Sequence, residues 1–156
     1  MTVRVQENDF DVSDELALLR KGRSDIGAIT SFVGLVRDSS SVINSDSPIV
    51  LNMTLEHYPG MTEKALEAIV EQAKSRWSVT DALIIHRVGL LQLGEQIVFV
   101  AVTSQHRGDA FAACEFMMDY LKTEAPFWKK EQTEHGANWV EAKSTDDKAR
   151  DRWKNK

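Results

Sequence analysis

Two lysines on either side of a proline are the side chains with the clearest potential for chemistry. The stretch 121–131 reads LKTEAPFWKKE, and Lys122 ends a segment with the apolar pattern of a helix. Pro126 stops that helix, so the following strand can bring Lys129 back toward Lys122. Two amines held together beside apolar walls repel each other and lose hydration, which favours a neutral amine that acts as nucleophile or base. Alternatively, Lys122 only complements the helix dipole, and Lys129 and Lys130 lie on a solvated edge strand.

A second group of polar residues follows the most apolar segment of the chain. The residues Thr103 to Asp109 read TSQHRGD, where a buried strand ends and a helix begins. Such a junction presents unpaired helix N–H groups, and His106 and Arg107 add donors and positive charge beside them. The pattern predicts an anion pocket. Spacing alone equally allows Arg107 to pair with a surface carboxylate and His106 to bond the backbone.

Arg37 is a third candidate, because it precedes a serine-rich segment, 38–48, whose composition cannot order itself by burial. We expect that segment to be a mobile loop. An arginine at its base is suited to closing over a phosphate, and it is equally suited to being an ordinary exposed residue at a strand end.

The remaining histidines and the single cysteine show no pattern typical of a metal site or a nucleophile. His57, His86 and His135 lack the spacing of metal ligands, and Cys114 lies in an apolar helical pattern typical of core. No nucleophile elbow, phosphate-binding loop or dinucleotide motif is present in the sequence. We therefore expect no metal and no cofactor.

The composition predicts one globular domain. The chain has 156 residues, 42% of them hydrophobic and 28% charged, which suits a self-sufficient core. The net charge of −5 makes nucleic acid or an anionic membrane an unlikely partner, so any anion site must be local. A single cysteine, no signal-peptide pattern and no long apolar run favour a cytoplasmic protein.

Periodicity predicts the elements that must position these side chains. Ser13 or Asp14 is a candidate cap for the first helix, and Thr62 for the second. A charged tail, 144–156, is expected to fray, with Trp153 able to pin it. The expected strands are 3–6, 26–36, 51–56, 82–88, 96–104, 127–135 and 138–142, and the expected helices are 12–22, 62–77 and 109–124.

Five segments together resemble a known family, the large catalytic subunit of molybdopterin synthase (MoaE type). The likeness covers roughly residues 3–143, in the right order and at the right intervals, which makes it more specific than any one motif. We take 1–143 as the family domain. The segments are 27–38 (GAITSFVGLVRD), 55–61 (LEHYPGM), 86–95 (HRVGLLQLGE), 106–111 (HRGDAF) and 121–131.

The resemblance implies an α+β fold, an α/β hammerhead with an additional antiparallel β-sheet. It also implies a homodimer with a small ubiquitin-like sulfur carrier (MoaD type) docked at each end, which makes a heterotetramer. The implied reaction transfers sulfur from the carrier's C-terminal thiocarboxylate to cyclic pyranopterin monophosphate and forms the dithiolene of molybdopterin. A noncatalytic docking module for a ubiquitin-like tail and a phosphate-ligand binding protein are the alternatives.

The resemblance also implies roles for individual positions. Lys122 and Lys129 match the lysines nearest the carrier terminus and are the expected catalytic pair. We expect one cationic cleft that unites them with His106 and Arg107, because both reactants are anions. The positions expected to bind substrate are Leu35, Val36, Arg37, His106, Arg107, Lys122, Lys129, Lys130 and Glu131.

Overall fold

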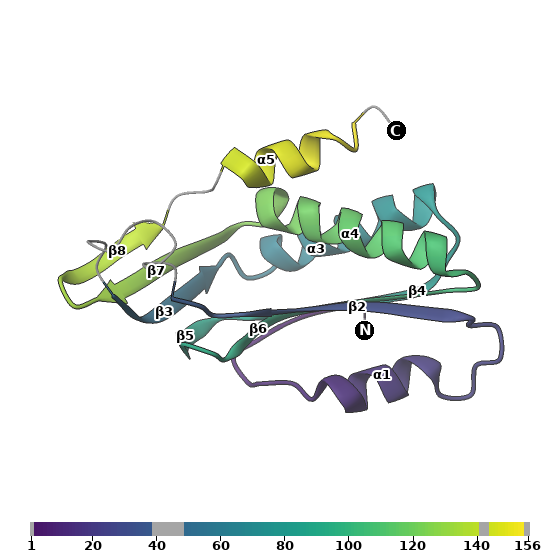
Figure 1. The fold of residues 1–156 in the computed structure, drawn as a ribbon, viewed down its shortest axis with the longest axis horizontal. Coiled ribbons are helices and arrows are strands. Elements are labelled where there is room, and N and C mark those ends of the chain that lie inside the picture. The colour runs from purple at the N-terminus through teal and green to yellow at the C-terminus, as the bar shows by residue number, and fades with distance from the viewer. Residues whose placement is uncertain (1, 39–48, 141–143, 155–156) are drawn as a thin grey trace.

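A computed structural model describes residues 2–38, 49–140 and 144–154 as two β-sheets with helices packed around one of them (Figure 1). Sheet A has the strand order β1-β4-β6-β2, and sheet B has the order β5-β3-β7-β8. The elements are β1 (Val3–Gln6), α1 (Val12–Arg20), β2 (Ala28–Leu35), β3 (Val50–His57), α3 (Met61–Arg76), β4 (Val79–Arg87), β5 (Gly89–Gln92), β6 (Gln96–Ser104), α4 (Arg107–Glu124), β7 (Phe127–Thr133), β8 (Gly136–Val140) and α5 (Ser144–Asp151).

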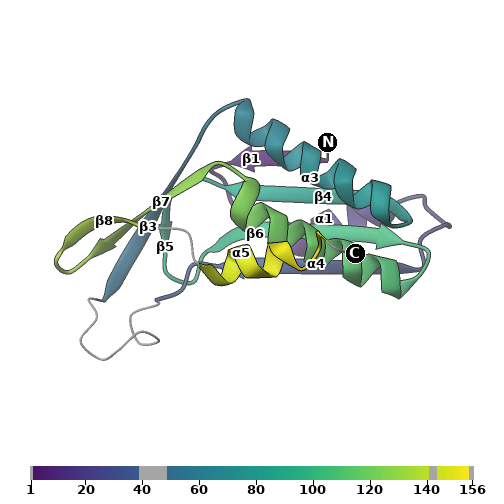
Figure 2. The same cartoon turned by 90° about the horizontal axis from the view of Figure 1, so that it is seen from above.

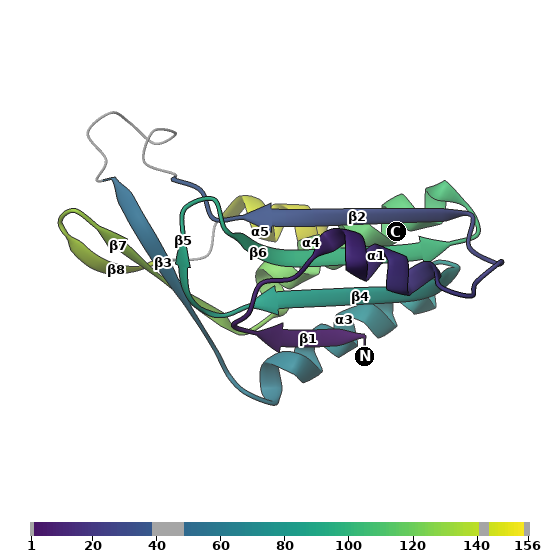
Figure 3. The same cartoon turned by 90° about the horizontal axis from the view of Figure 1, so that it is seen from below.

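Sheet A is mixed and is covered on both faces. β1 pairs with β4 in parallel, whereas the β4–β6 and β6–β2 pairs are antiparallel. α3 and α4 lie over one face and α1 over the other (Figures 1 and 3). β6 lies between β4 and β2 and is buried along almost its whole length, which is why its sequence is a continuous apolar run rather than an alternating one.

Sheet B is antiparallel throughout and lies at one end of sheet A (Figure 2). Its inner face buries Met53, Leu55 and Leu91. Its outer face exposes Leu90 and Trp128, because successive side chains of a strand point to opposite faces. The strand predicted from the alternation in 51–56 is therefore confirmed, with one dry and one wet face.

α4 connects the two ends of the molecule. It begins directly after β6 and runs back over sheet A, so its last turn lies over the end of the sheet where β6 starts (Figure 2). The helix ends at Glu124, since Pro126 has no N–H to donate and disfavours a helical conformation in the residue before it. Its buried residues cover more than one stripe: Ala110, Ala113, Cys114, Phe116, Met117, Met118 and Leu121.

The C-terminal segment differs from the frayed tail that its charge suggested. It forms α5, and Trp153 is buried with 6% of its surface exposed. The indole packs edge-on against Trp77 and Phe116, with ring centroids 5.4 and 5.7 Å apart, and its N–H donates to Asp119 at 2.7 Å. Aromatic burial and one charge-assisted hydrogen bond thus anchor a segment whose own composition is polar.

Two predicted helix caps are wrong. α1 is capped by Asp11, whose carboxylate accepts the N–H of Asp14 at 2.9 Å, rather than by Ser13 or Asp14. Thr62 lies inside α3 and is buried; its hydroxyl donates to the carbonyl oxygen of Pro126 at 3.1 Å. Thr62 therefore ties the start of α3 to the turn between α4 and β7.

Residues 89–94 are not among the predicted strands, but they contain the short strand β5, which pairs with β3. Gly89 and Gly94 both have φ of 86°, so each supplies the left-handed turn that flanks this strand. The loop predicted for 38–48 falls almost wholly outside the described residues.

The α+β class and the additional antiparallel sheet expected from the sequence are confirmed. None of the helices within the described ranges combines the length and apolar character that a bilayer span requires.

Candidate functional site

The lysine end of the molecule is built by the last turn of α4 and the first half of β7. Lys122 is exposed and Lys129 is half-buried. The charges of both ammonium groups act on the same buried side chain, His86, which is 5% exposed. The turn at Pro126 therefore brings β7 back beside the end of α4, as the sequence predicted.

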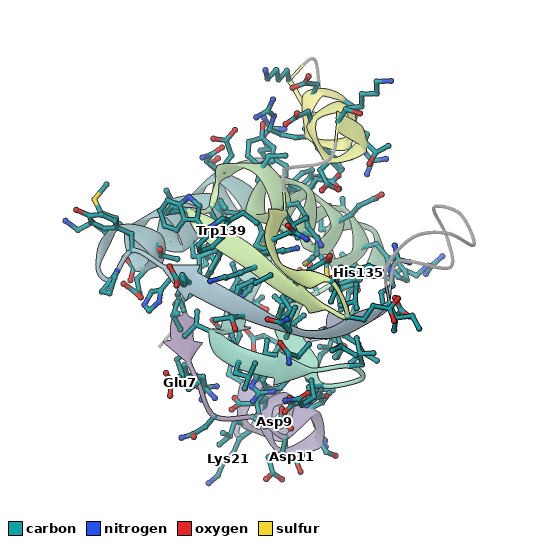
Figure 4. All side chains as sticks on the ribbon, turned by 90° about the vertical axis from the view of Figure 1, so that its left-hand side faces the viewer. Glu7, Asp9, Asp11, Lys21, His135 and Trp139 are labelled. Carbon is teal, nitrogen blue, oxygen red and sulfur yellow. The ribbon has the colours of Figure 1, made fainter. Side chains whose placement is uncertain are left out.

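β7 sorts its polar residues onto two faces. Lys129 pairs with the buried Leu55 of β3, so Lys129 and Glu131 belong to the inner face of sheet B. Lys130 belongs to the outer face, where its ammonium lies 5.5 Å from the ring centroid of Trp139. Figure 4 shows Trp139 on the sheet B side of the molecule. Lys130 thus does not line the same surface as Lys129, contrary to the expectation of one continuous lysine segment.

Arg37 lies at the lysine end of the molecule. β2 pairs with β6 so that Leu35 is opposite Gln96, the first residue of β6, and the last turn of α4 lies over this end of sheet A (Figure 2). Val36 is buried, and its N–H donates to the carbonyl of Glu95 at 2.9 Å. This bond fixes the backbone just before Arg37, whose side chain is exposed.

His106 and Arg107 line a pocket of about 500 Å³ at the start of α4. Both side chains are exposed, and the remaining lining comes from residues 27–28, 105 and 108. The helix begins at Arg107, so its first N–H groups and the positive end of its dipole open toward this pocket. The arrangement fits the anion pocket predicted from the TSQHRGD junction.

α4 separates this pocket from the lysines. Arg107 is in its first turn and Lys122 in its last, which corresponds to roughly 22 Å along the axis at about 1.5 Å per residue. The two groups lie at opposite ends of sheet A (Figure 2). One chain therefore does not form the single cationic cleft that the sequence analysis expected.

Two histidines at the lysine end were not selected from the sequence, where they were only rejected as metal ligands. His57 ends β3, and its Nε2 lies 3.6 Å from a carboxylate oxygen of Glu63. His86 is the second-last residue of β4, and its ring stacks on Phe127 with centroids 3.9 Å apart. A polar residue at the end of the apolar segment 82–86 was the only sequence signal for His86.

The environment of His86 keeps its ring neutral. The pKa of His86 is lowered to about 3, mainly because burial penalises the charged form, and the charges of Lys129, Lys122 and His57 act in the same direction. The opposing influence is a hydrogen bond between Nδ1 and the carbonyl oxygen of Arg87, at 2.9 Å.

Cys114 is core, as predicted. It is buried, and burial raises the pKa of its thiol to about 11, with a smaller contribution from the charge of Glu115. A thiol in this state is a poor nucleophile. Among the described residues, no three His, Cys, Asp or Glu side chains gather as a metal site.

Comparison with known proteins gives a coherent answer. The family model described as MoaE protein matches residues 5–124. The molybdopterin synthase catalytic subunit of Ralstonia nicotianae is 63% identical over 152 residues, which is 97% of this chain and 84% of that protein. A solved MoaE protein of Burkholderia ambifaria has a TM-score of 0.81 at 56% identity and covers 97% of both chains. A molybdopterin synthase structure from Staphylococcus aureus has a TM-score of 0.80 at 28% identity, covering 90% of this chain and 98% of that one. The chain belongs to the MoaE family, whose members include the catalytic subunits of molybdopterin synthase.

Proposed function

We propose that this chain is a molybdopterin synthase catalytic subunit, which moves sulfur from the C-terminal thiocarboxylate of a small ubiquitin-like carrier to cyclic pyranopterin monophosphate. Two such transfers build the dithiolene of molybdopterin. The observation that carries the proposal is that the charges of Lys122 and Lys129 both act on the buried His86, at one end of a chain that belongs to the MoaE family. The carrier terminus and the substrate phosphate are both anions, and a local basic site on an acidic protein attracts them.

In this proposal Lys122 and Lys129 are the catalytic residues. Their ammonium groups bind the thiocarboxylate and stabilise negative charge that develops as sulfur adds to the pterin carbon. One of them also carries the proton that accompanies the exchange of oxygen for sulfur. No metal or nucleotide takes part.

The remaining positions bind substrate. His106 and Arg107 bind the phosphate region at the start of α4, where helix N–H groups add donors. Arg37 is a further substrate contact, with the adjoining backbone of Leu35 and Val36. Lys130 and Glu131 extend the contact along β7; of these, Glu131 shares the inner face with Lys129, and Lys130 would have to act from the outer face.

A second copy of the chain completes the site in this proposal, because α4 holds the two basic groups apart within one copy. β2 is an edge strand of sheet A, with Phe32 41% and Leu35 55% exposed. Its Ala28 end lies beside His106 and its Leu35 end beside Arg37. Antiparallel pairing of two β2 edges about a two-fold axis would set the His106 end of one copy against the lysine end of the other.

The carrier follows from the same reasoning. The relatives are named catalytic subunits, which implies at least one other subunit. A carrier at each end of the homodimer gives a heterotetramer. We place the reaction in the cytoplasm, since a lone cysteine suits a reducing compartment.

The test is to mix the purified chain with thiocarboxylated carrier and the cyclic substrate, and to follow sulfur incorporation by mass spectrometry. The proposal expects dithiolene product and a carrier that ends in a carboxylate. Carrier binding without turnover would instead support a noncatalytic docking module. Tight uptake of the phosphorylated ligand with no requirement for carrier would support a phosphate-ligand binding protein.

A further inference from the structure

His86 lies next to the proposed catalytic lysines but has no place in the roles given above. Side chains alternate along β4, and Ile84 packs in the core beneath α3 and α4, so His86 projects to the same side of sheet A. This is the side that carries the last turn of α4 and the start of β7 (Figure 1). The imidazole therefore occupies the junction between the two sheets.

The proton on this imidazole has a defined position. Nδ1 lies 2.9 Å from the carbonyl oxygen of Arg87, and a carbonyl oxygen only accepts, so Nδ1 carries the hydrogen. Arg87 is itself fixed: its guanidinium donates to the carbonyl of Glu7 at 3.0 and 3.1 Å and to that of Gln96 at 2.9 Å. The ring is thus held at one edge by a rigid piece of backbone.

The face of the ring meets β7. His86 and Phe127 stack with ring planes 21° apart. Phe127 is the first residue of β7 and pairs with His57, and Lys129 follows two residues later on the same inner face. The stack therefore contacts β7 at its first residue, two positions before Lys129.

Resting on the proposed function, we propose that His86 is a positioning residue: its flat ring stacks on Phe127 and holds the start of β7, so that Lys129 faces the same reaction site as Lys122. The ring does not touch the reacting atoms in this scheme. It acts through Phe127.

The charges around His86 explain why a neutral ring is needed. Lys129 faces it from β7, Lys122 from α4 and His57 from β3, while Arg87 follows it on its own strand. The carboxylate of Glu63 in α3 also faces this group, and one of its oxygens lies 3.6 Å from Nε2 of His57. A cation at position 86 would be buried among cations, which is strongly unfavourable.

Two variants at position 86 distinguish the contribution of ring stacking from that of the imidazole's hydrogen bond. His86→Phe and His86→Leu both lose the hydrogen bond to Arg87 and both stay neutral, but only phenylalanine keeps a ring to stack on Phe127. His135→Leu is the control for loss of a histidine elsewhere, since His135 is exposed in the β7–β8 turn. The measurements are the single-turnover sulfur-transfer rate at saturating carrier and substrate, and carrier affinity by calorimetry.

We expect His86→Leu to slow transfer by at least about tenfold with carrier affinity nearly unchanged, because misplacement of a catalytic group acts on the rate of the bound state. We expect His86→Phe to restore most of the lost rate. Equal rates for the two variants, or a carrier affinity that falls in parallel with the rate, would overturn the proposal. If His86→Leu does not fold, Phe127→Leu removes the other ring of the stack and must show the same loss of rate.

A measurement on the free chain keeps this inference separate from the proposed function. Nuclear Overhauser contacts between the rings of His86 and Phe127 are expected in the parent chain without carrier or substrate. Their absence would overturn the inference even if the parent transfers sulfur. Their presence in a parent that transfers no sulfur would instead identify the proposed function as the part that fails.

Discussion

The carbonyl oxygen of Gln105 lies directly against the α-carbon of Gly27, so that a Cβ built on Gly27 would be 2.1 Å from it. Both partners are backbone, and neither can rotate out of the way. The adjacent N–H of Gly27 donates to the carbonyl of Ser104 at 2.9 Å. Close backbone approach at this point therefore sets the position of the loop that carries His106 at the start of α4.

Gly27→Ala is accordingly expected to displace this loop. The clash should lower the free energy of unfolding by about 1–3 kcal/mol and weaken binding of the phosphorylated substrate. Gly108→Ala is the matched control for stability alone, because Gly108 also lines the pocket; a Cβ there meets nothing within 4 Å, and alanine favours the helix. Urea unfolding and calorimetric titration of substrate give the two measurements, and equal stability of the two variants would contradict the account of Gly27.

Lys129 and Lys130 are adjacent in sequence but lie on opposite faces of sheet B. Lys129→Ala is expected to reduce the single-turnover rate by about a hundredfold or more, since a charge that stabilises the transition state is lost. Lys130→Ala removes an equal charge from the outer face beside Trp139 and is expected to cost less than about fivefold. Rates of both variants at saturating carrier test this order, and a Lys130 effect as large as that of Lys129 would assign the outer face to the site.

Trp153 is expected to be the residue that holds α5 on the body of the protein. Trp153→Ala removes a buried ring together with its hydrogen bond to Asp119, and should lower the free energy of unfolding by about 3 kcal/mol or more. Trp139→Ala removes the same side chain from a site where it is 55% exposed, and should cost less than about 1 kcal/mol. Hydrogen exchange of the α5 amides must rise in the first variant only.

Much of this fold follows from local pattern. The amphipathic stripe on α3, the all-apolar β6 and the Pro126 stop each express a physical rule that acts within a few residues. β5 was missed because four residues between glycines carry too little pattern, and their identity as a strand depends on pairing with β3. The docking of α5 was not predicted because it depends on the burial of a single tryptophan, Trp153, in a segment whose other residues are mostly charged.

The site was only partly predictable for a similar reason. The turn after α4 is a local feature, so the approach of Lys129 to Lys122 could be foreseen. The separation of His106 from the lysines depends on the length of α4, and the residue types at its two ends do not indicate that distance. The stack of His86 on Phe127 joins residues 41 positions apart in two different sheets, and no local pattern encodes it.

The neutral state of His86 makes stability depend on pH. Its pKa is about 3 in the folded chain and about 6.5 in an unfolded one, so the unfolded state binds the proton first as pH falls. His86 therefore lowers the free energy of unfolding as the pH falls through about 6.5, by about 1.6 kcal/mol at pH 5 relative to pH 6.5. His86→Phe lacks this proton, so its stability should fall less over the same interval. Urea unfolding at several pH values checks the difference, and parallel curves would show that the ring titrates normally.

Complementation between inactive chains tests whether a second copy completes the site. Lys122→Ala and Arg107→Ala each remove one of the two basic groups that α4 separates, so each homodimer should be inactive. In the proposed dimer, each site takes Lys122 from one copy and Arg107 from the other copy. A mixed dimer therefore has one site with both substitutions and one site with neither.

Random pairing makes half of the dimers mixed, so co-expression of the two variants should restore about a quarter of the parent activity. Co-expression of Lys122→Ala with Lys129→Ala is the control, because both residues lie at the same end of α4 and the mixed dimer gains no intact site. Light scattering should find a dimer in every case. Failure of the first pair to recover activity, with dimers present, would mean that each site draws both groups from its own chain or does not use Arg107 at all.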